Sequence, residues 1–188
     1  MLNVDYKIIA KVLANRIKTF LPKLINEDQK GFVSGRNIQD ANRLIQDIIE
    51  NSDMNNEEGS IIFLDQEKAF DRVEWEWIYK CLNGFNFGEK YIKWIIMILE
   101  KSKTCINTNG FVSEYFEISR SARQGCPISP LLYIIQSEPL ACTIRANTDI
   151  QGMQLPNGKS VKINLFADDT QLFNKNENSI KECFKTIN

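Results

Sequence analysis

The chain has 188 residues, 43% of them apolar, with 23 Lys and Arg against 24 Asp and Glu and no histidine. This length suits about one domain with a substantial buried core. The lack of histidine excludes Ser-His-Asp and Cys-His hydrolases and zinc enzymes with histidine ligands. Any chemistry must therefore use carboxylates, lysines, hydroxyls or a metal held by oxygen ligands.

The cysteines and apolar runs predict an intracellular protein without a membrane partner. Five cysteines are scattered without a Cys-x-x-Cys pair, which favours a reduced compartment and buried thiols. The longest apolar run, residues 94–99, is far too short to span a bilayer. Residues 1–5 show no signal-peptide pattern.

Charge is distributed unevenly along the chain. Residues 1–36 carry seven Lys and Arg against three Asp and Glu, whereas residues 37–90 carry five against twelve. A basic end beside an acidic middle is consistent with a phosphate-facing surface next to a metal-binding carboxylate cluster. Taken alone, the asymmetry is better explained by solvated helix faces.

Two helices are predicted before residue 60. Apolar residues recur at helical spacing over residues 4–24, and Pro22 weakens or ends this helix. Asn37 can cap a second helix, which a polar loop over residues 51–59 follows. The predicted buried face of the first helix is Ile8, Ile9, Val12, Leu13, Ile17, Phe20 and Leu21.

A glycine-containing loop, residues 29–36, joins these helices. Gly31 and Gly35 flank a phenylalanine, and Arg36 closes the loop. Such a loop can bring backbone N–H groups and an arginine against phosphates. It can equally be a simple connector, which is the better interpretation of the loop alone.

The middle of the chain contains a buried strand that ends in a carboxylate. Residues 60–65 form an apolar run closed by Asp65. An unpaired, half-buried charge is costly, so Asp65 suits a ligand at a strand end. The elements expected next are helices over residues 74–82, 90–100 and 131–145 and a hairpin over residues 104–118 that turns at Asn109-Gly110.

A second strand leads into two adjacent aspartates. Residues 160–166 alternate as a strand, and residues 170–173 return as its hairpin partner, so a tight turn would hold Asp168 and Asp169. This pair is either a solvated turn or part of a metal site. Ser179 begins a capping-box pattern for a last helix. The order of elements predicts an α+β domain with a small, mostly antiparallel sheet packed on helices.

Three carboxylates would meet if these strands are neighbours. Mg²⁺ prefers oxygen ligands and needs only a few carboxylates plus substrate phosphates. Two such ions, roughly 3.5–4 Å apart, stabilise the attacking and leaving oxygens of phosphoryl transfer. Asp65, Asp168 and Asp169 are therefore the candidate metal ligands.

Three motifs follow one another along the chain, after several upstream segments. The motifs are Leu64-Asp65-Gln66-Glu67-Lys68-Ala69-Phe70-Asp71-Arg72-Val73, Arg123-Gln124-Gly125-Cys126-Pro127-Ile128-Ser129-Pro130 and Phe166-Ala167-Asp168-Asp169, and the upstream segments are Leu2-Asn3-Val4-Asp5-Tyr6-Lys7, Leu13-Ala14-Asn15-Arg16 and Gly31-Phe32-x-x-Gly35-Arg36. In this order they resemble motifs of reverse transcriptases from non-LTR retrotransposons, the long-interspersed-element type. The resemblance covers nearly the whole chain.

The resemblance implies a right-hand polymerase palm that joins dNTPs to a DNA primer on an RNA template. Asp65, Asp168 and Asp169 would be catalytic and would hold two Mg²⁺ ions, or Mn²⁺ in their place. The backbone carbonyl of Gln66 would help hold the metal of the nucleotide. A nuclear location or a cytoplasmic ribonucleoprotein is expected by the same resemblance.

The resemblance also implies nucleotide and template contacts. Phe70 would lie under the incoming sugar and exclude a 2′-hydroxyl, although an ordinary core phenylalanine explains it as well. Arg123 would approach phosphates or form a structural ion pair. The remaining implied contacts are Ala69, Gln124 and Gly125 with the nucleotide, and Gly31, Phe32, Gly35 and Arg36 with the template.

Differences from the family pattern lower the expected activity of the chain by itself. Met1 stands where the family has an Arg-Pro strand, and the chain stops before the primer grip and thumb. Residues 1–59 would be incomplete fingers and residues 60–188 the palm. Because lost positioning removes much of the rate, we expect little or no primer extension and some uncovered apolar surface. The alternatives are a non-catalytic remnant that binds RNA weakly through residues 1–36, and a two-metal nuclease.

Overall fold

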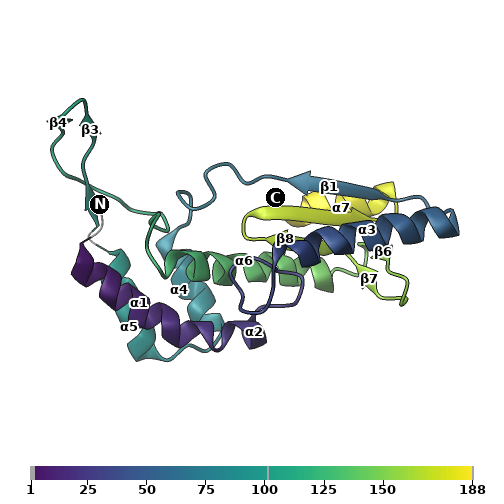
Figure 1. Ribbon diagram of the computed structural model, residues 1–188, viewed down its shortest axis with the longest axis horizontal. Helices are drawn as coiled ribbons and strands as arrows, with labels where there is room; N and C mark the ends of the chain where they lie inside the picture. Colours follow the sequence, from purple (N-terminus) through teal and green to yellow (C-terminus); the bar gives the residue numbers. More distant parts are fainter. Residues whose placement is uncertain (1–2, 101, 188) are drawn as a thin grey trace. The chain divides into compact units, whose positions relative to one another are not determined.

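The computed structural model describes residues 3–100 and 102–187 (Figure 1). The helices are α1 (Val4–Lys18), α2 (Leu21–Leu24), α3 (Ile38–Asn55), α4 (Trp75–Gly84), α5 (Glu89–Leu99), α6 (Ser129–Ala146) and α7 (Glu177–Ile187). The strands are β1 (Ser60–Leu64), β2 (Lys103–Thr104), β3 (Asn107–Thr108), β4 (Phe111–Val112), β5 (Phe116–Glu117), β6 (Met153–Gln154), β7 (Ser160–Val161), β8 (Ile163–Phe166) and β9 (Asp169–Asn174). All strand pairs among these elements are antiparallel, so the predicted α+β class is confirmed.

The elements form two compact units. We call Met1–Ile17 with Lys68–Gln136 the helical unit, and Lys18–Glu67 with Ser137–Asn188 the sheet unit. The predicted functional division at residue 59 is a different kind of boundary and stays a prediction. Leu2, which begins one of the upstream matches, lies outside the described residues.

The sheet unit is built on a three-stranded sheet in the order β1-β9-β8. Because side chains alternate along a strand, Leu172 and Phe173 of the central strand face opposite sides, and both are fully buried. Leu172 packs with side chains of α6 and α7, and Phe173 packs with Ile48 of α3. Figure 1 shows α3 and α7 running alongside the strands. Helices therefore cover both faces of the sheet.

The helical unit contains most of α1, then α4, α5 and the first half of α6. Its buried side chains include Ile78 and Leu82 of α4 and Ile95 and Leu99 of α5. The Tyr91 hydroxyl donates a hydrogen bond of 3.0 Å to the Leu13 carbonyl, which ties α5 to α1. Burial raises the pKa of the Tyr91 hydroxyl, which is consistent with this enclosed position.

The buried face of α1 differs from the prediction. Leu13 is buried as expected, but Ile8 and Val12 are 58% and 55% exposed, whereas Ala10 and Ala14 are buried. Small side chains let neighbouring elements approach a helix closely, so the spacing of the large apolar residues does not reveal this face. The helix also ends at Lys18, before Pro22, and the chain continues as the separate short helix α2.

The predicted start of α3 is confirmed, whereas its end lies later than predicted. The Asn37 side chain accepts hydrogen bonds from the N–H groups of Gln39 and Asp40, at 2.9 and 3.2 Å. The helix continues into the segment 51–59 that was predicted as a loop, as far as Asn55. It stops where Asn56 adopts a left-handed φ of 53°, a common way to end a helix.

The last helix begins earlier than the capping-box pattern suggested. Helix α7 starts at Glu177, and the side-chain oxygen of Asn176 accepts a hydrogen bond of 2.9 Å from the Ser179 N–H. Asn176 therefore caps the helix, while Ser179 lies inside its first turn and is fully buried.

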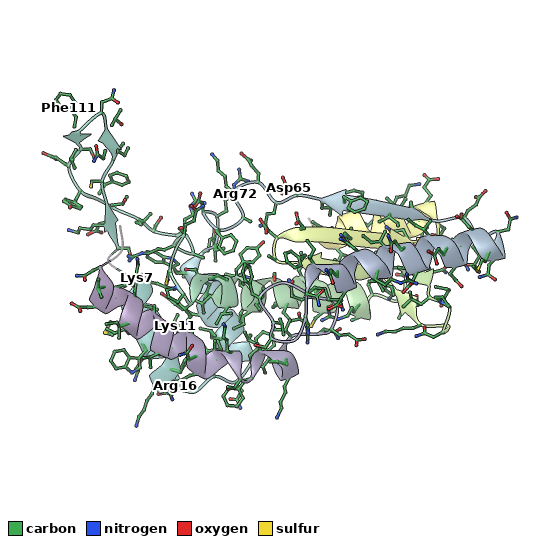
Figure 2. All side chains as sticks on the ribbon, viewed as in Figure 1. Lys7, Lys11, Arg16, Asp65, Arg72 and Phe111 are labelled. Carbon is green, nitrogen blue, oxygen red and sulfur yellow. The ribbon has the colours of Figure 1, made fainter. Side chains whose placement is uncertain are left out.

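The hairpin at Asn109-Gly110 is confirmed. Both turn residues have positive φ angles, 51° and 86°, as a type I′ turn requires. Phe111 follows the turn, is 83% exposed and lies at the tip of the hairpin in Figure 2. Single exposed apolar side chains are normal on a protein surface, so the uncovered apolar surface expected from the sequence stays a prediction.

Across the residues that the structure describes, no helix combines the length and the apolar character that crossing a membrane requires.

The five cysteines are all free thiols. Cys81, Cys126 and Cys183 are buried, as predicted, but Cys142 is exposed. Burial raises the pKa of the Cys81 thiol to about 11, so this sulfur is protonated and unreactive at neutral pH.

Candidate active site

The predicted hairpin that carries the two adjacent aspartates is present. Phe166 pairs with Asp169, so the turn consists of Ala167 and Asp168, and Asp169 is the first residue of β9. The prediction that the turn holds both aspartates is therefore wrong for Asp169. Ala167 has a φ of 57°, a left-handed conformation that costs a non-glycine residue roughly 1–2 kcal/mol. The turn is thus strained and must be held by its surroundings.

Strand pairing brings Asp65 to the same end of the sheet. Leu64 of β1 pairs with Thr170 of β9, and this register places Asp65 beside Asp169. Both aspartates are exposed and line one pocket of about 300 Å³. Asp65 is labelled where the chain leaves β1 in Figure 2. The other lining residues are Ile38, Ala41, Asn42, Phe63, Leu64, Phe166, Thr170 and Gln171.

The donor atoms of this pocket suit a hard cation. Two carboxylates contribute oxygens, and Mg²⁺ is commonly held by one or two carboxylates together with water and substrate phosphates. Among the described residues, no three His, Cys, Asp or Glu side chains come close enough together to hold a metal. The convergence of all three aspartates on shared ions, with the Gln66 carbonyl beside them, stays a prediction.

The glycine loop packs against the turn between β8 and β9. A Cβ atom on Gly31 would lie 2.4 Å from the backbone nitrogen of Ala167, so only glycine fits there. The side chain of Gln29 is buried and bonded to the same turn, a contact that the sequence did not predict. Its only sequence signal is its place two residues before Gly31. Gly31 is therefore required by packing, whereas its predicted template contact stays a prediction.

The guanidinium of Arg36 forms hydrogen bonds within the sheet unit. It donates hydrogen bonds to the carbonyls of Ile25 and Gln29, at 3.0 and 2.8 Å, and also to that of Asn26. Arginine can donate five hydrogen bonds, so these contacts occupy much of its capacity. The structure gives Arg36 a role in holding the loop together, and its predicted contact with template stays a prediction.

The other two residues predicted to contact the template lie in the same loop. Phe32 is 48% exposed and has a φ of 56°, so it presents its ring to solvent. Gly35 has a φ of 83°, and a Cβ atom added to it would have no other atom within 4 Å, so its conformation rather than its packing favours glycine. Burial lowers the pKa of the neighbouring Lys30.

The residues predicted to contact the nucleotide lie in the helical unit. Phe70 stacks on Tyr133 with ring centroids 4.7 Å apart, and its carbonyl accepts the Ala122 N–H at 2.7 Å. Phe70 is partly exposed and Tyr133 is buried, so one ring is held against a fixed partner. Ala69 is buried, and its predicted nucleotide contact stays a prediction.

Arg123 has a partner that the sequence did not indicate. Its guanidinium carbon lies 4.9 Å from the ring centroid of Tyr6, a cation–π contact. The Tyr6 hydroxyl lies 3.4 Å from the Cys126 sulfur, and burial raises the pKa of that hydroxyl. Gln124 and Gly125 are exposed between these two anchors, and Gly125 has a φ of 75°. The segment 123–126 is therefore held at both ends by contacts with Tyr6, while Gln124 and Gly125 in its middle are exposed to solvent.

Replacing Gly31 by alanine is expected to destabilise the fold by at least about 1–3 kcal/mol, since the new methyl group meets backbone rather than a movable side chain. The matched control is Gly84→Ala at the end of α4, where no atom lies within 4 Å. There the reduced freedom of the unfolded chain should stabilise the protein by about 0.4–1 kcal/mol. Urea denaturation measures the free energy of unfolding of both variants. Equal midpoints for the two variants would contradict the packing argument.

Comparison with known proteins identifies the family. Residues 1–188 match the family described as reverse transcriptase (RNA-dependent DNA polymerase), so the chain belongs to the reverse transcriptase family. The chain is 31% identical, over 92% of its length, to the transposon TX1 uncharacterized 149 kDa protein of Xenopus laevis. It is 27% identical, over 88% of its length, to the Pol polyprotein of the retrotransposable element R2DM of Drosophila melanogaster. It spans 13% and 16% of the lengths of these two relatives.

Solved structures support the fold. The chain superposes on apo telomerase from Candida tropicalis with a TM-score of 0.64 and 11% identity, over 97% of this chain and 33% of the telomerase chain. A telomerase structure in complex with a fragment of telomeric RNA gives a TM-score of 0.65 at 12% identity. At such low identity these similarities show a shared fold only.

The non-LTR retrotransposon resemblance seen in the sequence is confirmed by the TX1 and R2 relatives.

Proposed function

We propose that this chain supplies the metal-binding palm of an RNA-directed DNA polymerase. The observation that carries the proposal is the pocket at the end of the β1-β9-β8 sheet, where Asp65 and Asp169 meet beside the turn that holds Asp168. Mg²⁺ prefers carboxylate oxygens, and a pair of such ions stabilises both the attacking and the leaving oxygen of phosphoryl transfer. The substrates would be an RNA template, a DNA primer and dNTPs.

The aspartates would hold Mg²⁺, or Mn²⁺ in its place, against the nucleotide phosphates. Bound divalent ions would stabilise the charge that builds up on the attacking and leaving oxygens of the transfer. The role of the protein is then to orient its three carboxylates. The strand register supports this role, because it holds Asp65 and Asp169 at fixed neighbouring positions.

Phe70 would select the sugar of the nucleotide. A ring that cannot move aside excludes a 2′-hydroxyl by size, and the stacking of Phe70 on the buried Tyr133 supports such rigidity. Arg123 is anchored over Tyr6, and this contact favours a structural role over phosphate binding. The exposed backbone at Gln124 and Gly125 leaves room for a base or sugar to approach.

Primer extension tests the proposed function. The purified chain is given a DNA primer annealed to an RNA template, dNTPs, and Mg²⁺ or Mn²⁺. We expect weak extension at most, and any extension should require the divalent ion, be lost in Asp168→Asn and be retained in Asp149→Asn. Asp149 is an exposed aspartate of the sheet unit outside the pocket, so its variant controls for the loss of one charge.

The same assay distinguishes the alternative functions. Absence of extension together with salt-sensitive RNA binding would support a non-catalytic remnant, because salt weakens contacts with phosphates. Cleavage of the template in the absence of dNTPs would instead support a two-metal nuclease. Either result would contradict the polymerase proposal for this chain.

A further inference from the structure

Gln29 makes an unusual set of contacts with the turn that carries Asp168. Its side chain is only 1% exposed. The amide oxygen accepts the Ala167 N–H at 2.9 Å, and the amide nitrogen donates to the Ala167 carbonyl at 3.3 Å. The same oxygen also accepts the Gly31 N–H at 2.8 Å. One side chain thus bonds both backbone polar groups of a single turn residue.

Ala167 needs such a partner. It is 6% exposed and lies in the turn, beyond the last strand pair of the hairpin, so the ladder of β8 and β9 does not satisfy its N–H and carbonyl. A buried backbone group without a partner costs about 1–3 kcal/mol. The left-handed φ of 57° adds strain. The bonds from Gln29 offset both costs and keep the turn in this conformation.

The segment that carries Gln29 is itself held firmly against β8. The Lys30 N–H donates to the Leu165 carbonyl at 2.7 Å, and the Leu165 N–H donates to the Asp28 carbonyl at 2.8 Å. The Asp28 carboxylate accepts a 2.7 Å hydrogen bond from Arg145 of α6. The carbonyl of Gln29 accepts one from Arg36. The Gln29 side chain therefore extends from a fixed backbone, so it can hold the turn rather than follow it.

We propose that Gln29 is a positioning residue for the aspartates of the active site. By fixing Ala167, Gln29 sets the orientation of Asp168, which lies in the turn, and of Asp169, which follows it. The geometry of the carboxylates that would bind a divalent ion depends on this orientation. This inference rests on the proposed function, because it assigns a partner to the same carboxylates. Gln29 itself lies under the turn and does not line the pocket that Asp65 and Asp169 share.

The chemistry of the contact requires an amide. Two N–H groups need an acceptor and one carbonyl needs a donor, and glutamine offers both in one plane. Glutamate of the same size can accept but cannot donate when ionised, and burying its charge is costly. Methionine keeps the volume and loses all three hydrogen bonds. Gln29→Met and Gln29→Glu therefore separate hydrogen bonding from packing. The matched controls are Gln46→Met and Gln46→Glu at an exposed position on α3.

The test combines amide hydrogen exchange with Mn²⁺ binding by electron paramagnetic resonance. We expect Gln29→Met to raise the exchange rates of the Ala167 and Gly31 amides at least about tenfold, and to leave the amide of Phe173 in β9 unchanged. Mn²⁺ affinity should fall about 10–100-fold, the range found when groups that orient metal ligands are removed. A general loss of structure would instead raise exchange throughout β9.

The glutamate variant isolates the donated hydrogen bond. An ionised glutamate can accept from the N–H groups of Ala167 and Gly31, but it cannot donate to the Ala167 carbonyl. We expect the melting temperature of Gln29→Glu at neutral pH to lie below that of Gln46→Glu. Equal melting temperatures would contradict the buried contact.

The outcomes separate the two proposals. If the unsubstituted chain binds Mn²⁺ and Gln29→Met binds it equally well, the positioning role is overturned and the proposed function stands. If the unsubstituted chain binds no Mn²⁺, both are overturned. Should Gln29→Met fail to fold, Gln29→Glu at neutral pH, where the ionised carboxylate cannot donate, takes its place. Fast exchange of the Ala167 amide in the unsubstituted chain would overturn the role of Gln29 without any variant.

Discussion

Asp65→Asn is expected to weaken Mn²⁺ binding by the chain at least about tenfold. The substitution replaces an anionic oxygen ligand by a neutral amide of the same size, and Mg²⁺ and Mn²⁺ sites with few carboxylates depend on each of them. Asp65 is exposed and lines the pocket with Asp169, so no buried packing is lost. Electron paramagnetic resonance of Mn²⁺ measures the affinity directly.

The same substitution should slightly stabilise the fold. The strand register places Asp65 beside Asp169 on a neighbouring strand, and like charges opposite one another on neighbouring strands are destabilising by about 0.2–1 kcal/mol. Weaker metal binding together with equal or higher thermal stability is a signature that damage to the fold cannot produce. Asp149→Asn should change neither quantity. Equal Mn²⁺ affinity in Asp65→Asn and the unsubstituted chain would contradict the site.

Phe173→Ala is expected to cost about 3–5 kcal/mol of folding free energy, a large part of the stability of a domain of this size. Phe173 is fully buried in the central strand β9, opposite Ile61 of β1, and packs against Ile48 of α3. Removing its ring leaves a cavity between the sheet and the helix, which the surrounding elements can fill only in part. Because β9 begins with Asp169, the hairpin that carries Asp168 and Asp169 should loosen as well.

A second phenylalanine of the same sheet provides the control. Phe63 in β1 is 65% exposed, so Phe63→Ala should change stability by less than about 0.5 kcal/mol. Urea denaturation of both variants, followed by circular dichroism, gives the two free energies. Similar losses for Phe63→Ala and Phe173→Ala would show that the sheet is not packed as described.

Local patterns in the sequence determined most of the elements and the position of the candidate metal-binding aspartates. The apolar run before Asp65, the alternating strand before Asp168 and the Asn109-Gly110 turn each depend on neighbouring residues only. Strand alternation, capping by Asn37 and type I′ turn chemistry are local effects, so they can be predicted without knowledge of the fold. The motif order then indicated the family, which the comparisons confirmed.

Contacts between distant parts of the chain were decided only by the tertiary structure. Small alanines rather than large apolar residues set part of the buried face of α1. Arg36 donates to the backbone carbonyls of Ile25 and Gln29, and Arg123 lies over Tyr6. The bonds from Gln29 to Ala167 join residues 138 positions apart. No sequence period encodes a hydrogen bond to a strained backbone turn, because the partner is chosen by where the folded chain brings an amide, not by the residues on either side of it.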